Sequence, residues 1–151
     1  MGLISFFQGV GEKIFHKEAA APTPEEEPLR ASALLAHVKQ LGLAYNSLSV
    51  KTSVDTVTIE GEVAKQEDAE KIALAVGNVE GVKIVDNRLK VATPAPEATY
   101  HTVVKGDTLS LIAKAVYGDM MKYPIIFEAN KPMLTHPDKI YPGQVLRIPA
   151  L

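Results

Sequence analysis

The chain has 151 residues, enough for one ordinary domain or two small ones, and its 46% hydrophobic and 23% charged residues are normal for a globular protein. The formal net charge of −2 leaves no basic stripe to meet phosphates, which argues against a nucleic-acid partner. The absence of cysteine excludes disulfides, thiolate metal sites and cysteine nucleophiles.

Residues 1–18 predict a short helical segment, because Leu3, Phe6, Phe7 and Val10 recur at near-helical spacing. So short a piece cannot bury these side chains by itself, and we expect it to dock on the domain that follows. A membrane surface is the alternative, but the segment has lysines only near its end. Because a signal peptide's positive n-region is missing and no apolar run approaches the ~18 residues of a membrane helix, we expect a cytoplasmic protein without a membrane partner.

Two proline-containing spacers, 19–27 and 92–98, divide the chain. Their small, polar and acidic residues are typical of linkers rather than of a packed core. They separate the N-terminal segment from a middle domain at 28–91 and a C-terminal domain at 99–151. The fold class that we predict is therefore α+β, with two small domains.

The middle domain reads as helix, strand, strand, helix, strand. Apolar residues at helical spacing predict a first helix at 31–41, and alternating residues predict two strands around a turn at 53–55. A second helix begins near Lys65 with Gly77 as its expected C-terminal cap, and a last strand covers 85–91.

This order of elements, with the phrases VTIEGEV at 57–63 and VEGVKIVDNRLKV at 79–91, resembles a BON domain. The resemblance implies an α-β-β-α-β fold. BON domains are mostly known from periplasmic or membrane-associated proteins, so the missing export signal departs from that pattern.

The C-terminal domain contains VVKGDTL at 103–109 and IYPGQVLRIP at 140–149, with two helix-like stretches between them. Gly106 lets the backbone turn, and Asp107 is placed to cap a helix that starts at Thr108. Pro142-Gly143 forms a tight turn that feeds a short strand. These phrases resemble a LysM domain, which has a β-α-α-β fold and is best known for binding N-acetylglucosamine polymers.

The sequence shows no catalytic constellation, and we do not expect an enzyme. The histidines His16, His37, His101 and His136 fall in four separate elements without a second ligand at metal-binding spacing. No serine lies in a nucleophile elbow, and no glycine-rich phosphate loop follows a strand. For Asp107, helix capping is favoured over the role of a catalytic acid.

The whole arrangement resembles the small bacterial cytosolic BON–LysM proteins that bind potassium. The resemblance implies selective binding of K⁺, with Rb⁺ or Cs⁺ as substitutes, and a role as a cytoplasmic ion sensor in a stress response. Proteins select K⁺ with neutral carbonyl oxygens, and a helix C-terminus offers about four carbonyls without intrahelical partners.

The second helix of the middle domain ends at 75–78, and the chain then turns through 79–82 with mostly small or apolar side chains, so inward polar groups there must be backbone. The simpler alternative is that Gly77-Asn78 is only a helix cap. Weighed with the resemblance, the carbonyls expected to bind K⁺ are those of Phe7, Val10, Gly77, Val79 and Val82. The short spacer at 92–98 keeps the LysM domain close, so a bound cation could create the surface on which it docks.

Glycan binding is the competing function, in a groove between the loop after the first LysM strand and the loop before the last. The candidate groove residues are Gly106, Asp107, Thr108, Leu109, Leu134, Asp138 and Ile140. The lack of tryptophan makes stacking on a sugar poor. A third interpretation is that the groove binds another protein. In each case we expect a monomer.

Overall fold

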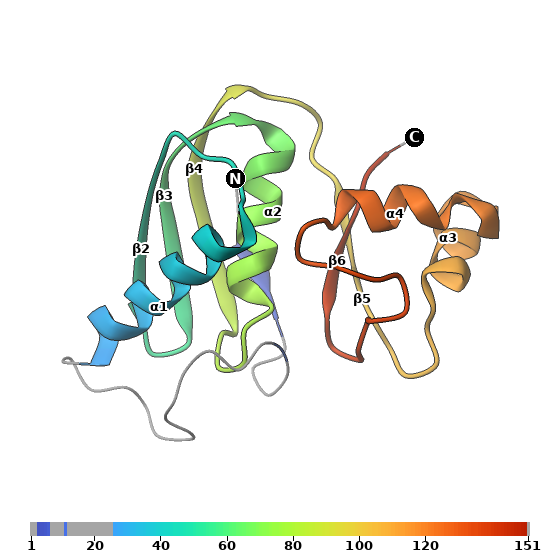
Figure 1. Cartoon of the computed structure of the whole chain (residues 1–151), viewed down its shortest axis with the longest axis horizontal. Helices are drawn as coiled ribbons and strands as arrows, with labels where there is room; N and C mark the ends of the chain where they lie inside the picture. The colour runs from blue at the N-terminus through green and yellow to red at the C-terminus, as the bar shows by residue number, and fades with distance from the viewer. Residues whose placement is uncertain (1–2, 7–10, 12–25, 151) are drawn as a thin grey trace.

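The computed structural model describes residues 3–6, 11 and 26–150, with side chains from residue 30 onward in the first helix. These residues form a four-stranded sheet packed with two helices, followed by a two-stranded sheet with two further α-helices and one 3-10 turn (Figure 1). This confirms the predicted α+β class and its two small domains.

The first domain contains four strands and two helices. Its elements are β1 (Leu3–Ser5), α1 (Glu26–Leu41), β2 (Ser47–Ser53), β3 (Thr56–Lys65), α2 (Gln66–Gly77) and β4 (Ile84–Thr93). The strand order is β1-β4-β3-β2, in which β3 and β4 are parallel and the other pairs are antiparallel. Helix α2 makes the crossover between the parallel strands, as a βαβ unit requires.

The helix predicted for the N-terminal segment is wrong over Leu3–Ser5, which form β1 and pair with β4 in the register Ile4↔Val85. Ile4 and Phe6 turn inward while Leu3 and Ser5 are exposed, so the period is two rather than 3.6. These residues form a strand because the free edge of β4 supplies hydrogen-bond partners that an isolated short helix lacks. These residues do pack on the middle domain, as expected.

The turn predicted at 53–55 is present in the first domain, and a second turn follows α1. Val54 has φ +56° between β2 and β3, and Gly42 has φ +76° directly after α1. The N–H of Gly42 donates to the carbonyl of Lys39, which closes the last turn of α1. Helix α1 begins at Glu26, inside the stretch that was expected to be a spacer.

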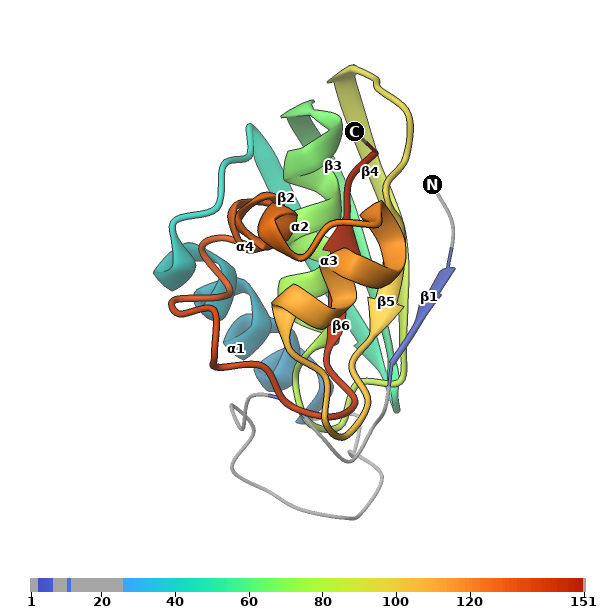
Figure 2. The ribbon, with the colours of Figure 1, turned by 90° about the vertical axis from the view of Figure 1, so that its right-hand side faces the viewer.

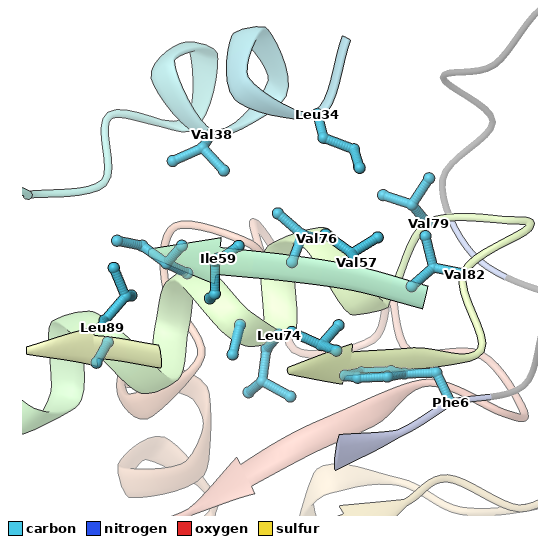
Figure 3. Packing of buried hydrophobic residues seen from close by; sticks show 14 of the residues in the cluster. Phe6, Leu34, Val38, Val57, Ile59, Leu74, Val76, Val79, Val82 and Leu89 are labelled. Carbon is cyan, nitrogen blue, oxygen red and sulfur yellow. The ribbon is translucent and has the colours of Figure 1, made fainter. Parts of the chain in front are cut away.

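The core of the first domain lies between the sheet and its helices (Figure 3). Leu34 and Val38 of α1 face Val57 and Ile59 of β3, and all four side chains are at most 2% exposed. The alternation of apolar and polar residues along β3 directs its valines and isoleucine to this face. The inward-facing residues therefore follow the pattern expected from the sequence.

The second domain has the predicted β-α-α-β order. It consists of β5 (Thr99–Thr102), α3 (Leu109–Tyr117), the 3-10 turn η1 (Met120–Lys122), α4 (Tyr123–Ala129) and β6 (Val145–Ile148). Strands β5 and β6 pair antiparallel, and Ile112 and Ile126 of the two helices pack with Leu146 in a separate core. In the part of the chain that the structure describes, no helix is both long and apolar enough to cross a membrane.

The cap of α3 differs from the prediction. Thr108, not Asp107, is the N-cap, and its Oγ1 accepts a hydrogen bond from the N–H of Leu111 at 3.1 Å. Asp107 instead accepts from the N–H of Val104 at 3.0 Å and contacts Nε2 of His101 at 2.9 Å. Threonine already has a capping oxygen at the correct position, so the carboxylate remains free to close the preceding turn.

Candidate cation site and the interface between the domains

The loop from Gly77 to Lys83 joins α2 to β4 and contains three of the five expected ligands. Gly77 is the last residue of α2, and Asn78 rather than Gly77 is the C-cap, with its N–H bonded to the carbonyl of Leu74 at 2.9 Å. The N–H of Val82 donates to the carbonyl of Val79 at 3.1 Å, which closes the loop on itself. Gly81 has φ +100°, a conformation that glycine adopts readily.

The carbonyls of Gly77, Val79 and Val82 are therefore grouped in one compact turn. The side chains of Val79 and Val82 are buried in the core, so these residues offer only backbone to a ligand (Figure 3). Between described residues, no backbone–backbone hydrogen bond outside the helices and strands ends on the carbonyl of Gly77 or Val82. The carbonyl of Val79 accepts one bond and keeps a second lone pair.

The other two expected ligands, Phe7 and Val10, lie outside the described residues, but the residues on either side of this stretch contact the loop. The N–H of Phe6 donates to the carbonyl of Lys83 at 2.6 Å, and the Phe6 ring lies directly on Gly77. Gly11 has φ +117°, and a Cβ built on it would lie 2.5 Å from the carbonyl oxygen of Asn78. Two points of the N-terminal segment thus meet the end of α2.

Asn78 joins this loop to the second domain through a pair of hydrogen bonds. Its Nδ2 donates to the carbonyl of Val145 at 2.8 Å, and the N–H of Val145 donates to its Oδ1 at 2.9 Å. The side chain is 4% exposed, and Nδ2 also lies 3.4 Å from Sδ of Met133. The amide thus satisfies both backbone groups of one residue on β6.

A second polar contact crosses the interface farther along α2. Glu70 accepts from Nε of Arg147 at 2.7 Å and from the N–H of Ala98 at 3.1 Å, and the Glu70 side chain is 1% exposed. Nε2 of Gln66 lies 3.4 Å from the same carboxylate. Burial, and next the negative charge of Glu70, raise the pKa of the nearby Tyr100 hydroxyl far above its usual range.

Helix α2 is covered on two sides. Nine of its twelve residues are buried, more than one apolar stripe against a sheet would bury. Figures 1 and 2 show the C-terminal domain against the side of α2 that faces away from the sheet. Val145, Tyr100 and Met133 of the C-terminal domain join the core of the first domain there. The structure therefore shows the two domains docked.

The apolar members of the expected glycan groove belong to the core or pack against it. Leu109 and Leu134 are each 2% exposed and belong to the core of the second domain, against which Ile140 packs. Gly106 is exposed with φ +91°, and Asp138 is exposed beside His136. The apolar members therefore stabilise the fold instead of lining a groove.

The polar groove residues make local bonds. Thr108 caps α3, as described above. The hydrogen bond from His101, and then the one from the N–H of Val104, hold the pKa of Asp107 below its ordinary value. In the described part of the chain, no group of three His, Asp or Glu side chains is arranged to hold a metal ion.

Three interface residues were not predicted from the sequence, namely Glu70, Asn78 and Arg147. Glu70 lies among the charged residues Glu67, Asp68 and Lys71 and gives no sign that it is buried. Arg147 carries a signal that was available, because it interrupts the apolar strand VLRI. A charged residue in such a place is buried only when it is paired. Asn78 had the form of an ordinary helix cap.

Comparisons with known proteins agree with this architecture. Residues 29–93 match the BON domain family and residues 101–149 match the LysM domain family. The chain is 43% identical over 150 residues to the potassium binding protein Kbp of Escherichia coli, with 99% of each chain covered. It is 38% identical over 134 residues to an uncharacterized protein of Deinococcus radiodurans, covering 80% of this chain and 51% of that protein. An esterase of Mycobacterium tuberculosis is 47% identical over 53 residues, which are 35% of this chain and 11% of the esterase. The chain therefore belongs to the family of the potassium binding protein Kbp, in which a BON domain is followed by a LysM domain.

Proposed function

We propose that this protein binds K⁺ selectively through backbone carbonyls of Phe7, Val10, Gly77, Val79 and Val82. We further propose that it acts, as a monomer in the cytoplasm, as a potassium sensor without catalysis. Bound K⁺ favours the docked arrangement of the two domains, and Rb⁺ or Cs⁺ substitutes for it.

The observation that carries the proposal is the meeting of Phe6 and Gly11 with the loop after α2. Both residues flank the stretch that contains Phe7 and Val10, and both contact the loop at or next to Gly77. The family relative in Escherichia coli is named a potassium binding protein. Carbonyls from these two chain segments would together replace the water shell of K⁺, as neutral oxygens do in other potassium sites.

The chemistry of the loop suits a large monovalent cation better than a small divalent one. Ca²⁺ and Mg²⁺ sites are built from carboxylates, whereas the proposed ligands are uncharged and two of their side chains point into the core. The C-terminal end of α2 adds the negative end of its dipole. The site therefore attracts a cation without a charged side chain as ligand.

Cation-dependent melting tests this proposal. The full chain is melted in Li⁺, Na⁺, K⁺, Rb⁺, Cs⁺, Mg²⁺ and Ca²⁺ at matched ionic strength. A ligand that binds only the folded state stabilises it by about 2.7 kcal/mol at a hundredfold excess over its Kd. K⁺ and Rb⁺ should raise the melting temperature and Na⁺ and Li⁺ should not. Equal shifts in Na⁺ and K⁺ would overturn the proposal, because they would report ionic strength alone.

Glycan binding is a second candidate, and it rests on the match of residues 101–149 to the LysM family. Because Leu109 and Leu134 are buried, a glycan would have to contact the exposed rim at Gly106, Thr108 and Asp138. Pull-down with purified cell wall separates the two functions. Retention on the wall together with a melting temperature indifferent to K⁺ would favour the glycan.

A further inference from the structure

The free edge of β6 is closed by two asparagine side chains. Among the residues that the structure describes, β5 is the one strand that pairs with β6, and alternate residues of β6 turn their N–H and C=O groups away from it. The N–H of Arg147 donates to Oδ1 of Asn130 at 2.7 Å, and Nδ2 of Asn130 donates to the carbonyl of Arg147 at 2.9 Å. Val145 has both groups bonded to Asn78 in the same way, at 2.9 Å and 2.8 Å. Each asparagine therefore takes the place of a third strand.

Both asparagines are the C-cap residue of a helix, but the two helices belong to different domains. Asn130 is the C-cap of α4 within the LysM domain, and Asn78 is the C-cap of α2 in the BON domain. The bonds of Asn130 are therefore kept in any arrangement of the domains. Of these two pairs of bonds, those of Asn78 to Val145 are the ones made on docking and lost on separation.

Asn78 also lies inside the proposed cation loop. The carbonyl of Gly77 and the Cα of Asn78 belong to one planar peptide unit, and the next unit carries the N–H of Val79. Turning the Gly77 carbonyl toward an ion therefore rotates this unit about its Cα atoms and changes φ of Asn78, the dihedral that sets the direction of its side chain relative to the unit. Asn78 has φ −82° and ψ +39°, outside the regular helix, so its orientation depends on the loop.

We propose that Asn78 is the positioning residue that transmits cation binding to domain docking, and that Glu70–Arg147 is a second contact that is indifferent to the cation. This inference rests on the proposed potassium binding. Glu70 is eight residues before Asn78 on α2, which is about 12 Å along a helix, and it bonds to the linker residue Ala98 and to Arg147 instead of to the loop. Its contacts do not depend on the direction of the loop carbonyls.

The quantity that separates these two roles is the coupling factor R. It is the ratio of docked to undocked protein in saturating K⁺ divided by the same ratio in Na⁺ at equal ionic strength. By reciprocity, R equals the factor by which docking strengthens K⁺ binding, and such factors are typically about 5–150. Removing a cation-independent contact lowers both ratios and leaves R unchanged. Removing the transmitting contact brings R to about 1.

Fluorescence energy transfer within the full chain measures R. The chain has no cysteine, so Ala36→Cys on α1 and Met121→Cys on η1, both at exposed positions, label the two domains specifically. The labelled parent is compared with Asn78→Ala and with the control Glu70→Gln, which keeps the shape of the buried side chain. We expect R to fall to within about twofold of 1 in Asn78→Ala and to remain within about twofold of the parent in Glu70→Gln.

A third variant tests the same bonds from the LysM side. Val145→Pro removes the N–H that donates a hydrogen bond to Oδ1 of Asn78. Proline is tolerated here because Val145 is the first residue of β6 and its N–H points away from β5. It leaves the cation loop unaltered and should also bring R to about 1. If Asn78→Ala does not fold by circular dichroism, Val145→Pro carries the test.

Three results would overturn the inference. The first is an unchanged R in both interface variants while docking weakens in both salts, because Asn78 would then be a contact like any other. The second is an equal fall of R in Glu70→Gln, since coupling would then belong to the interface as a whole. The third is an R of 1 in a parent that binds K⁺ by calorimetry. A parent that binds no K⁺ refutes the proposed function itself.

Discussion

Replacing Gly77 with alanine should destabilise the BON domain by displacing Phe6. A Cβ built on Gly77 would overlap Cζ, Cε1 and Cε2 of the Phe6 ring. Phe6 is 7% exposed, and its N–H is bonded to the carbonyl of Lys83, so its backbone is held in place and the ring must either strain against the added Cβ or leave the core. Gly77 does not have positive φ. The reason that it must be glycine is therefore the space that Phe6 occupies, and not a backbone conformation reserved for glycine.

The size of the effect follows from three terms. Overpacking a core costs about 1–3 kcal/mol, and expelling a buried phenylalanine loses about 1.5–3 kcal/mol of hydrophobic stabilisation. Alanine gains up to about 1 kcal/mol over glycine inside a helix, and less at its last residue. The first two terms are alternatives, because the ring either strains or leaves. The net destabilisation expected for Gly77→Ala is therefore about 1–2 kcal/mol.

Urea unfolding followed by circular dichroism, in Na⁺ so that K⁺ does not contribute, measures this change. In a Phe6→Ala background the clash is gone, so Gly77→Ala should be neutral or slightly stabilising, with a coupling energy of about 1–2 kcal/mol between the sites. Gly42→Ala is the matched control, because its φ is +76° and no atom lies within 4 Å of the added Cβ. Gly42→Ala should lower the free energy of unfolding by the same amount in the parent and in the Phe6→Ala background. An equal cost of Gly77→Ala with and without Phe6 would refute the reasoning.

Gly77→Ala should also weaken K⁺ binding, since Phe6 directly precedes the proposed ligand Phe7. Isothermal titration of the folded variant should show a higher Kd for K⁺ than the parent shows. Gly42→Ala, which lies away from the loop, should leave the Kd unchanged. An unaltered Kd in Gly77→Ala would separate the packing of Phe6 from the cation site.

Four further predictions follow from the structure. Because hydrogen bonds from a histidine ring and a backbone N–H depress the pKa of Asp107, its carboxylate stabilises the LysM domain fully above about pH 4. That contribution is lost as the pH falls through the lower folded pKa. Thermal melts of Asp107→Asn should not show this loss, and parallel pH profiles would contradict the role of the carboxylate. Asn130→Ala should destabilise the LysM domain by about 2–4 kcal/mol in chemical denaturation, because it leaves a buried N–H and C=O on β6 unpaired; a loss below about 1 kcal/mol would argue against this. Glu80→Gln should leave K⁺ affinity within a few-fold by titration calorimetry, while Gly81→Val, at φ +100°, should lower it; the reverse order would show that a carboxylate is the ligand. Deleting residues 1–10 should abolish K⁺ binding and K⁺-dependent compaction in small-angle scattering while both domains keep their circular dichroism. An intact protein with one radius of gyration in K⁺ and Na⁺ would refute the sensor mechanism.

The sequence alone predicted the order of helices and strands within 28–91 and 99–151. The helical spacing at 31–41 and the alternation along β3 both placed the correct side chains in the core. This works because each of these elements has one apolar face, and that face packs within its own domain. The turn at 53–55 and the tight turn before β6 were equally readable, since their residues have local conformational preferences.

The N-terminal segment shows where periodicity fails. The apolar residues Leu3, Phe6 and Phe7 fit a helix, but Ile4 and Phe6 also fit one face of a strand. The free edge of β4 decided between the two for Leu3–Ser5, and that edge exists only in the folded domain. The prediction that Asp107 caps α3 was wrong because two neighbouring residues could both act as the N-cap, and the geometry of the loop selected Thr108.

Part of the candidate site could be proposed from the sequence, and part of it depends on the tertiary structure. Gly77, Val79 and Val82 could be proposed from the sequence because they are close in the chain and follow a helix. The contacts of Phe6 and Gly11 with that loop depend on tertiary structure.

The interface between the domains was decided by the tertiary structure. Asn78 and Val145 are 67 residues apart, and Glu70 and Arg147 are 77 apart. Hydrophobic periodicity reports the apolar side of an element, so it identified the face of α2 that meets the sheet. It carries no information about polar groups that become paired only when two separately folded domains meet, and the second face of α2 is buried by that meeting.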